Sequence, residues 1–173
     1  MEACDVGAPE ADMTDASPIE KKPLQHCAIG EFVDELASDA ILPGAGAAGG
    51  VALALAAGCA GKAVAVSRKH DSNPALAGLQ IQFARIAQQA LALGRQDAIQ
   101  FKEQLKSDDP QAAVALLRTD YTLLDVCREL DKLLQDNRAL IADNMAGDWK
   151  AARALLHACR IIHNENVREL TGD

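Results

Sequence analysis

The sequence predicts an all-α protein: an orthogonal or antiparallel bundle of about five or six helices around a central helix rich in alanine and glycine. Three observations favour this fold class. Alanine dominates the apolar residues while aromatic residues are only 3% of the chain, which favours helices that pack closely through small side chains. Leucines recur at helical spacing, and two helix-start signals precede long periodic segments. With 173 residues, 49% of them hydrophobic, the chain can build the core of one domain.

The charge and cysteine content exclude several functional classes. A net charge of −8 argues against a nucleic-acid partner, because binding a phosphate backbone draws on clustered Lys and Arg. The five cysteines are odd in number and lack a CxxC spacing, which fits neither a disulfide framework nor a zinc module. We therefore expect reduced thiols and a cytoplasmic location. The apolar run 47–67 is mostly Ala and Gly and contains Lys62, so we expect no membrane partner.

The first part of the chain divides into a tail and a short helix. Residues 1–28 contain three prolines and few large apolar side chains, which predicts a flexible N-terminal tail. The remaining residues, 29–173, form a single domain in this interpretation. A short amphipathic helix is expected over 31–38, and it ends before Pro43.

The central and third helices follow. Small residues at steps of three and four form a smooth strip on the helix expected over about 47–67: Gly50, Ala54, Gly58 and Gly61. A second helix can approach closely along such a strip. The third helix should start at Ser72-Asn73-Pro74 and continue to about 107, a length of roughly 50 Å at about 1.5 Å per residue. Bends are expected at Gly78 and Gly94.

Two more helical segments complete the chain. Asp109-Pro110 repeats the start signal, and the leucines that follow keep helical spacing up to residue 134. A break is expected near Thr119. Gly147-Asp148 separates this segment from a last helix with one apolar face.

The turn Pro43-Gly44-Ala45-Gly46 runs directly into the central helix through Ala47. Glycine lets a ligand or a second backbone come close, and the free N–H groups of a helix start can hold an anion. The same pattern also suits a helix start followed by tight helix packing. Both interpretations stay open from the residues alone.

Three polar residues are candidates for chemistry. Asp97 recurs with Ala90, Leu93 and Phe101 on one face of the third helix, so it should be partly buried. A desolvated carboxylate has a raised pKa and can exchange a proton near neutrality, although a structural acid would occupy the same position. Asp148 could contact a ligand or cap the last helix. Asn166 could bind a ligand or tie two helices together.

No metal ligand set is predicted. His157, Cys159 and His163 are spaced two and four residues apart, and the two histidines lie six apart, so their side chains do not combine as the i, i+4 histidine pair that grips zinc does. The sequence also lacks a Ser/His/Asp elbow, a Walker loop and a dinucleotide-binding fingerprint.

Taken together, these motifs resemble the formiminotransferase-cyclodeaminase and methenyltetrahydrofolate cyclohydrolase family. The order and the intervals match over about residues 30 to 170. The matching segments are Glu31-Phe32-Val33-Asp34-Glu35-Leu36-Ala37-Ser38, Pro43-Gly44-Ala45-Gly46, Asp97-x-x-x-Phe101, Asp148-x-x-x-Ala152 and Asn166-Val167.

The resemblance implies an all-helical homodimer that binds a reduced folate or related pterin as substrate, without a tightly bound cofactor or a metal. It implies proton transfer by Asp97 in a cyclohydrolase or cyclodeaminase reaction. It also implies substrate contacts from a set of other matching residues: Pro43, Gly44, Ala45, Gly46, Ala47, Phe101, Asp148 and Asn166.

The chain departs from the family at the loop. The family reads Pro-Gly-Gly-Gly-Ser, whereas Ala45 and Ala47 here replace the middle glycine and the serine, and the stretch after Phe101 is shorter. If position 45 required positive φ, the alanine would cost on the order of 1 kcal/mol. The chain therefore resembles a shortened, divergent member of the family, and two alternatives to folate catalysis remain: a non-catalytic pterin-binding or interaction module, or an enzyme that uses a different reduced pterin.

Overall fold

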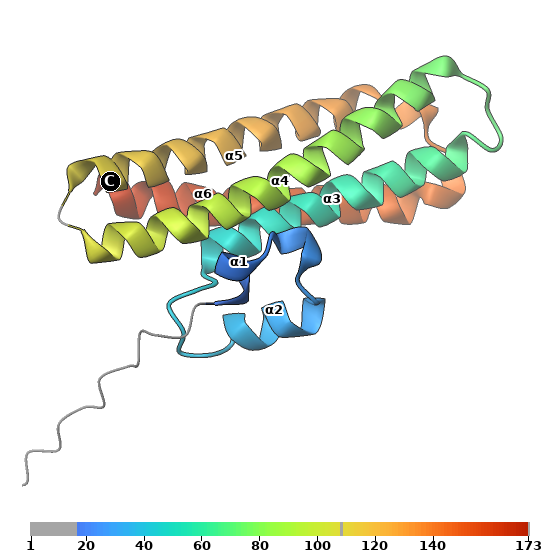
Figure 1. Cartoon of the computed structure of the whole chain (residues 1–173). Helices are drawn as coiled ribbons and strands as arrows, with labels where there is room; N and C mark the ends of the chain where they lie inside the picture. The colour runs from blue at the N-terminus through green and yellow to red at the C-terminus, as the bar shows by residue number, and fades with distance from the viewer. Residues whose placement is uncertain (1–16, 108, 173) are drawn as a thin grey trace, which may run out of the picture.

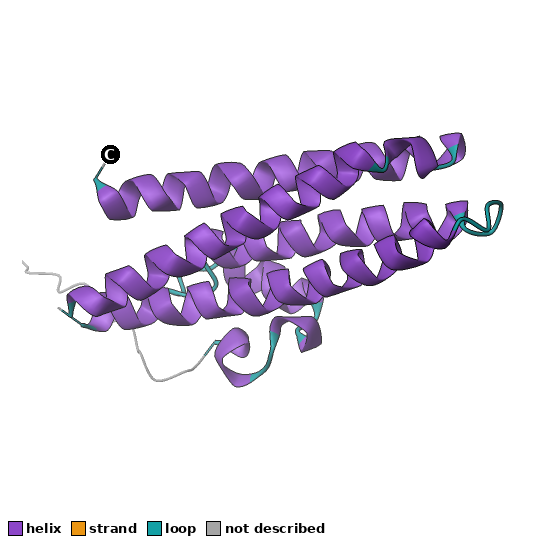
Figure 2. Cartoon of the chain, turned by 90° about the horizontal axis from the view of Figure 1, so that it is seen from above, coloured by secondary structure: helices purple, strands orange, loops and turns teal. Residues whose placement is uncertain are grey.

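The computed structural model describes residues 17–107 and 109–172, and within these ranges it contains helices and loops but no strand (Figures 1 and 2). Six α-helices occur in the described part of the chain: α1 (Pro18–Lys21), α2 (Ile29–Leu36), α3 (Ala45–Ser67), α4 (Pro74–Lys106), α5 (Pro110–Asp136) and α6 (Ala146–Thr171). Three 3₁₀ turns join them: η1 (Leu24–His26), η2 (Arg138–Leu140) and η3 (Asp143–Met145). The predicted all-α class is confirmed.

The four long helices α3 to α6 form an antiparallel bundle (Figure 1). Helix α3 packs against α4 and α6, and α5 closes the ring by packing against the same two helices. Consecutive helices run in opposite directions. The N-termini of α3 and α5 therefore lie at the same end of the bundle as the C-termini of α4 and α6.

The helix starts follow the predicted signals. The side chain of Asn73 accepts a hydrogen bond of 3.0 Å from the backbone N–H of Ala75 and caps α4. Asp109 caps α5 in the same way, accepting from the N–H of Gln111 at 2.9 Å. The predicted break near Thr119 is wrong, because α5 is continuous there. The Thr119 hydroxyl donates to Gln100 of α4 at 2.6 Å, so this polar residue is satisfied without leaving the helix.

The core forms around α3, as the sequence predicts. Its alanines at positions 56, 60 and 63 are fully buried, and larger side chains of α4, α5 and α6 fill the space around them. Near the start of α3 the backbones themselves meet: a Cβ built on Gly50 would lie 2.6 Å from Cα of Gly94. Gly94 therefore serves as a point of close helix contact. Helix α3 is long and apolar enough to cross a membrane, but half of its most apolar window is buried inside the bundle, as in a core helix.

The predicted N-terminal tail is wrong for residues 17–28, while residues 1–16 lie outside the described part. Ile19 and Leu24 are buried and pack with Leu42 against the bundle. The Arg95 guanidinium of α4 donates to the carbonyl of Ile19 at 2.7 Å and to that of Glu20 at 3.0 Å. These contacts fix the segment, so the folded unit begins about ten residues earlier than composition indicated.

Helix α2 lies beside the bundle, on the same side as α1 (Figure 1). Its eight residues are exposed or half-buried. The apolar side chains of Ile29, Val33 and Leu36 are 79%, 52% and 38% exposed. Of the apolar side chains of this helix, Phe32 packs against the cluster of Ile19, Leu24 and Leu42, while the other three stay exposed on the single chain.

Candidate functional site

A cavity of about 340 Å³ opens at the bundle end where α3 begins. Gly46 at the start of α3 lies against Asp97 of α4, and α4 continues for nine more residues to Lys106. Leu42 and Gly44, which precede α3, line the cavity at this end. This volume lies in the range of about 300–1,000 Å³ that is typical of ligand pockets. The cavity is lined by Leu42, Gly44, Ala45, Gly46, Asp97, Ala98, Phe101, Gln104, Leu105, Leu116, Asp120, Asn166, Glu169 and Leu170.

Asp97 is the buried acid of the cavity wall. The residue is only 4% exposed, and its Oδ1 has no hydrogen-bond partner among the described residues. Its carboxylate fits against α3 because residue 46 is glycine: a Cβ there would lie 1.9 Å from Oδ2. A buried acceptor without a partner is costly, so this oxygen is available for a donor that enters the cavity.

Burial raises the pKa of Asp97 from its ordinary value of 3.8 to about 7. The negative charge of Asp120 raises this pKa further, and the nearby His163 opposes the increase. A carboxyl group with this pKa exists in both protonation states near neutrality. It can therefore accept or deliver a proton, as the sequence predicted for a desolvated acid.

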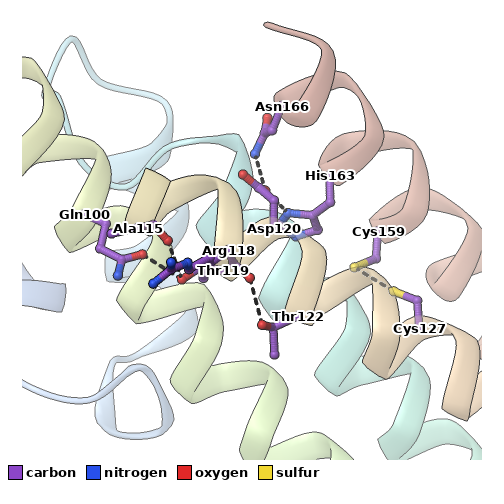
Figure 3. A network of polar contacts seen from close by, with 10 residues as sticks. All are labelled: Gln100, Ala115, Arg118, Thr119, Asp120, Thr122, Cys127, Cys159, His163 and Asn166. Carbon is purple, nitrogen blue, oxygen red and sulfur yellow. Dashed lines mark hydrogen bonds and ion pairs between the residues drawn. The ribbon is translucent and has the colours of Figure 1, made fainter. Parts of the chain in front are cut away.

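Behind Asp97, three polar side chains of α5 and α6 form a hydrogen-bonded group (Figure 3). Nδ1 of His163 lies 2.6 Å from Oδ1 of Asp120, and both side chains are fully buried. The amide of Asn166 donates to the same Oδ1 at 3.1 Å. The second oxygen of Asp120, Oδ2, and Nε2 of His163 have no hydrogen-bond partner within the described part of the chain.

Glycine also makes room for His163. A Cβ built on Gly49 would lie 2.5 Å from Nε2 of the imidazole. Gly46 and Gly49 are almost one turn apart on α3, so the helix presents a bare surface to both buried polar groups. This explains two of the glycines by close packing of polar side chains.

The cluster of Asp97, Asp120 and His163 brings one possible metal-ligand atom from each residue within 4.8 Å of the others. Two carboxylates and an imidazole are a reasonable donor set for a divalent cation. However, Nδ1 of His163 already contacts Asp120, and Nε2 lies against Gly49. The arrangement therefore fits a hydrogen-bonded acid–histidine group better than a coordination site.

The structure brings six of the nine site residues predicted from the sequence together at this cavity: Gly44, Ala45, Gly46, Asp97, Phe101 and Asn166. Pro43 and Ala47 are buried beside the loop and are not part of the cavity lining. Ala47 is fully enclosed by the core.

Asp148 does not join the site. It lies in the first turn of α6, whereas Asn166 lies in the last part of the same helix. Its carboxylate faces Lys62 at 3.5 Å, and the N-cap of α6 is Met145. Asp148 therefore lies outside the lining of this cavity and is not the N-cap residue of α6.

Asp120 and His163 are the functional candidates that the sequence interpretation missed. Asp120 recurs with Leu116, Leu123 and Cys127 on the buried face of α5, the same pattern that identified Asp97. The expected break at Thr119 hid this periodicity. His163 was considered only as a metal ligand, and its pairing with an acid from another helix has no signal in local spacing.

The buried thiols do not add a nucleophile. Sγ of Cys127 lies 3.5 Å from Sγ of Cys159, next to the Asp120 group (Figure 3). Hydrogen bonding with Cys127 and burial raise the pKa of the Cys159 thiol far above neutrality. It therefore stays protonated and unreactive.

Comparison with known proteins agrees with the architecture. No protein-family model and no curated protein matches the sequence. The crystal structure of formiminotetrahydrofolate cyclodeaminase from Thermotoga maritima superposes with a TM-score of 0.81 at 22% identity, covering 86% of this chain and 80% of that chain. The chain has the cyclodeaminase fold. The resemblance inferred from the sequence motifs is thus confirmed in the arrangement of the helices.

Proposed function

We propose that the protein acts on a reduced pterin that carries a one-carbon unit, with Asp97 as the proton carrier. The coarse assignment to folate one-carbon chemistry is supported by the shared fold with a folate cyclodeaminase. The observation that carries the proposal is the free oxygen of Asp97, buried at the wall of a cavity large enough for a small heterocycle.

In the cyclohydrolase form of the reaction, the substrate carbon lies between two nitrogens and is already a cation. The protein must orient water, accept one of its protons as the C–O bond forms, and return that proton to the nitrogen whose bond to carbon breaks; the second proton of the water is released to solvent as the C=O bond of the formyl group forms. Ionised Asp97 accepts the first proton and, once protonated, delivers it. Because its pKa is about 7, neither step is strongly uphill at neutral pH.

In the cyclodeaminase form, the N10 amine of the pterin attacks the carbon of the protonated formimino group. Ionised Asp97 accepts the proton of N10 as the new C–N bond forms and then delivers it to the NH2 nitrogen, which leaves as ammonia when its bond to carbon breaks. The two reactions need the same single group. The geometry therefore supports a common site for both.

The remaining lining suits a flat, partly apolar ligand. Phe101, Leu105 and Leu116 provide apolar walls, while Asn166 and Gln104 offer amide groups at the same cavity. The first-turn N–H groups of α3 receive no side-chain cap from Gly44. We infer that these N–H groups can donate to an acceptor atom of the ligand.

The experiment follows the loss of methenyl absorbance on addition of the protein, with ammonia release from the formimino adduct measured in parallel. Wild type should catalyse at least one reaction, and Asp97→Asn should lose most of that rate, on the order of a hundredfold or more. Asp125→Asn on the exposed face of α5 is the matched control. Equal rates for Asp97→Asn and wild type would remove Asp97 from the mechanism.

A second candidate is a non-catalytic protein that retained the fold and binds a pterin or a partner. It is motivated by the two alanines of the loop, of which Ala45 lines the cavity and Ala47 is sealed in the core. A third is catalysis on a reduced pterin other than folate. Calorimetric titration with several reduced pterins separates the three: tight binding without turnover supports the second, and preference for another pterin supports the third.

We also propose a homodimer in the cytoplasm. Support for the dimer comes from the apolar face of α2, where Ile29, Val33 and Leu36 are exposed. Support for the location comes from the absence of disulfides among the cysteines that the structure describes. Light scattering on the purified protein tests the dimer, and Val33→Glu should shift it towards the monomer.

A further inference from the structure

Two carboxylates face the same buried space from different helices. One oxygen of Asp97 on α4 and one of Asp120 on α5 belong to a group of atoms within 4.8 Å of one another. Both residues line the cavity, and each keeps one oxygen without a hydrogen-bond partner among the described residues. Two negative charges this close in a site shielded from water repel each other strongly, so ionising both carboxyl groups costs free energy.

The two acids differ in their partners. Oδ1 of Asp120 is held by Nδ1 of His163 and by the amide of Asn166. Asp97 receives no such bond at Oδ1 and rests against the bare backbone of Gly46. The amide N–H of Asn166 and the contact with His163 stabilise negative charge on Asp120, whereas Oδ1 of Asp97 has no donor in the described part of the chain.

We propose that Asp120, oriented by His163 and Asn166, is a positioning residue that acts on the proton exchange of Asp97 through the charge it places in the same buried space. The role in turnover rests on the proposed function, because it sets the pH range over which Asp97 can deliver and accept protons. The charged and titratable groups around Asp97 are Asp120 of α5, His163 of α6 and, at the cavity lining, Glu169 of α6. Helix α3 contributes only Gly46 at this contact.

The test is the titration of Asp97 itself, followed by carbon NMR of its carboxyl group in the full-length protein without any pterin. Asp120→Asn keeps an oxygen for His163 and Asn166 but removes the charge. The midpoint for Asp97 should then fall by about one pH unit, a tenfold change in proton affinity. Asp125→Asn, the same change on the exposed side of α5, should leave the midpoint where it is.

A second pair of variants at the same position separates charge from packing. Asp120→Glu keeps the negative charge and should leave the Asp97 midpoint near the wild-type value, whereas Asp120→Asn should lower it. A fall in Asp120→Glu as large as in Asp120→Asn would indicate structural loosening and overturn the proposal. If Asp120→Asn does not fold, Asp120→Ser, which also removes the charge, takes its place; a fall of the midpoint supports the proposal, and no change or a rise overturns it.

The outcomes also separate this proposal from the proposed function. If the Asp97 midpoint shifts in Asp120→Asn but the protein is inactive on every reduced pterin, the catalytic role is rejected and the charge coupling between the two acids is retained. If the protein is active on a pterin but the titration midpoint of Asp97 is the same in Asp120→Asn as in wild type, only the coupling between the two acids is rejected. In an active protein, the pH profile of kcat/KM should move in Asp120→Asn by the same amount as the NMR midpoint.

Discussion

The carboxylate of Asp97 occupies the space that a side chain at position 46 would need. Any Cβ on Gly46 would approach Oδ2 of Asp97 to 1.9 Å, far inside the contact distance of real atoms. The glycine of the loop thus has a definite structural function. It lets an acid from α4 lie directly against the first turn of α3, at the wall of the cavity.

Gly46→Ala should therefore displace Asp97 and lower the free energy of unfolding by about 1–3 kcal/mol. Gly44→Ala is the matched control, since a Cβ at residue 44 meets nothing within 4 Å and φ there is −110°. Urea unfolding of both variants measures the difference. Equal stability of the two would contradict the close packing of Asp97 on α3.

Gly49 and Gly58, both on α3, provide a test of how closely His163 packs against this helix. Gly49→Ala places a Cβ 2.5 Å from Nε2 of His163 and should disturb the His163–Asp120 contact, with a loss of about 1–3 kcal/mol. Gly58→Ala lies in the same helix at an exposed position with no atom within 4 Å. It should stabilise the protein by about 0.5–1 kcal/mol. A lower melting temperature for Gly58→Ala than for Gly49→Ala would be incompatible with the close packing of His163 on α3.

The raised pKa of Asp97 makes stability depend on pH. The unfolded chain releases this proton near 3.8, whereas the folded protein keeps it up to about 7. Between these values the folded state binds more protons, so the free energy of unfolding falls as pH rises and then levels off above about 7. The full difference corresponds to about 4 kcal/mol at most.

Asp97→Asn has no proton to lose at this site, so its stability should be flatter with pH. Urea unfolding at several pH values from 4 to 8 tests this, and the variant should gain on wild type as pH increases. Asp125→Asn, at an exposed position of α5, should follow the wild-type curve. A parallel course for Asp97→Asn and wild type would mean that Asp97 titrates normally in the folded protein.

Restoring the family loop should not stabilise the protein. Among the described residues, no residue other than glycine has positive φ, so Ala45 is unstrained, contrary to the cost considered from sequence. Ala45→Gly should lower stability by up to about 1 kcal/mol because it weakens the first turn of α3. Ala47→Ser would bury a hydroxyl at a fully enclosed position and should cost about 1–3 kcal/mol.

Activity of the double variant distinguishes the functional alternatives. If the protein turns over a reduced pterin only after both residues are restored, the loop of the natural chain has lost its catalytic competence. Catalysis by wild type that the double variant does not improve would show that the alanine loop is functional as it stands.

Arg95 should control access of proteases to the N-terminal segment. Arg95→Ala removes the donor for the carbonyls of Ile19 and Glu20, leaving the ion pair of Glu20 with Lys102 at 2.7 Å. Limited proteolysis should then cleave residues 17–28 several-fold faster than in wild type. Arg85→Ala, on an exposed part of α4, should show no change.

Much of the fold could be predicted because its signals are local. The capping residues Asn73 and Asp109 predict the starts of α4 and α5. The small residues of α3 predict a helix that packs closely against its neighbours. Asp97 was identified because one acid interrupts an otherwise apolar face. Each of these inferences needs only residues within a few turns of one another.

The rest depended on contacts between distant segments. Gln96 and Gln100 of α4 satisfy the hydroxyl of Thr119, so a residue that looked like a helix breaker lies within a continuous helix. Asp120 and His163 are separated by 43 positions and meet only after the bundle closes. Residues 17–28 looked too polar to fold alone, but two buried side chains and Arg95 hold them in place.

That anchored N-terminal segment bears on how the domain can be delimited. Leu24 reaches the crossing of α3 and α4, where its Cδ1 would lie 3.5 Å from a Cβ on Gly94, and it packs in one cluster with Leu42 and Ala98 of the cavity lining. A shortened chain that starts at residue 29 would expose apolar side chains at this contact and should aggregate more readily. N-terminal truncations should therefore keep Ser17 and all residues after it. Removing more would change the shape of the cavity as well as the solubility of the protein.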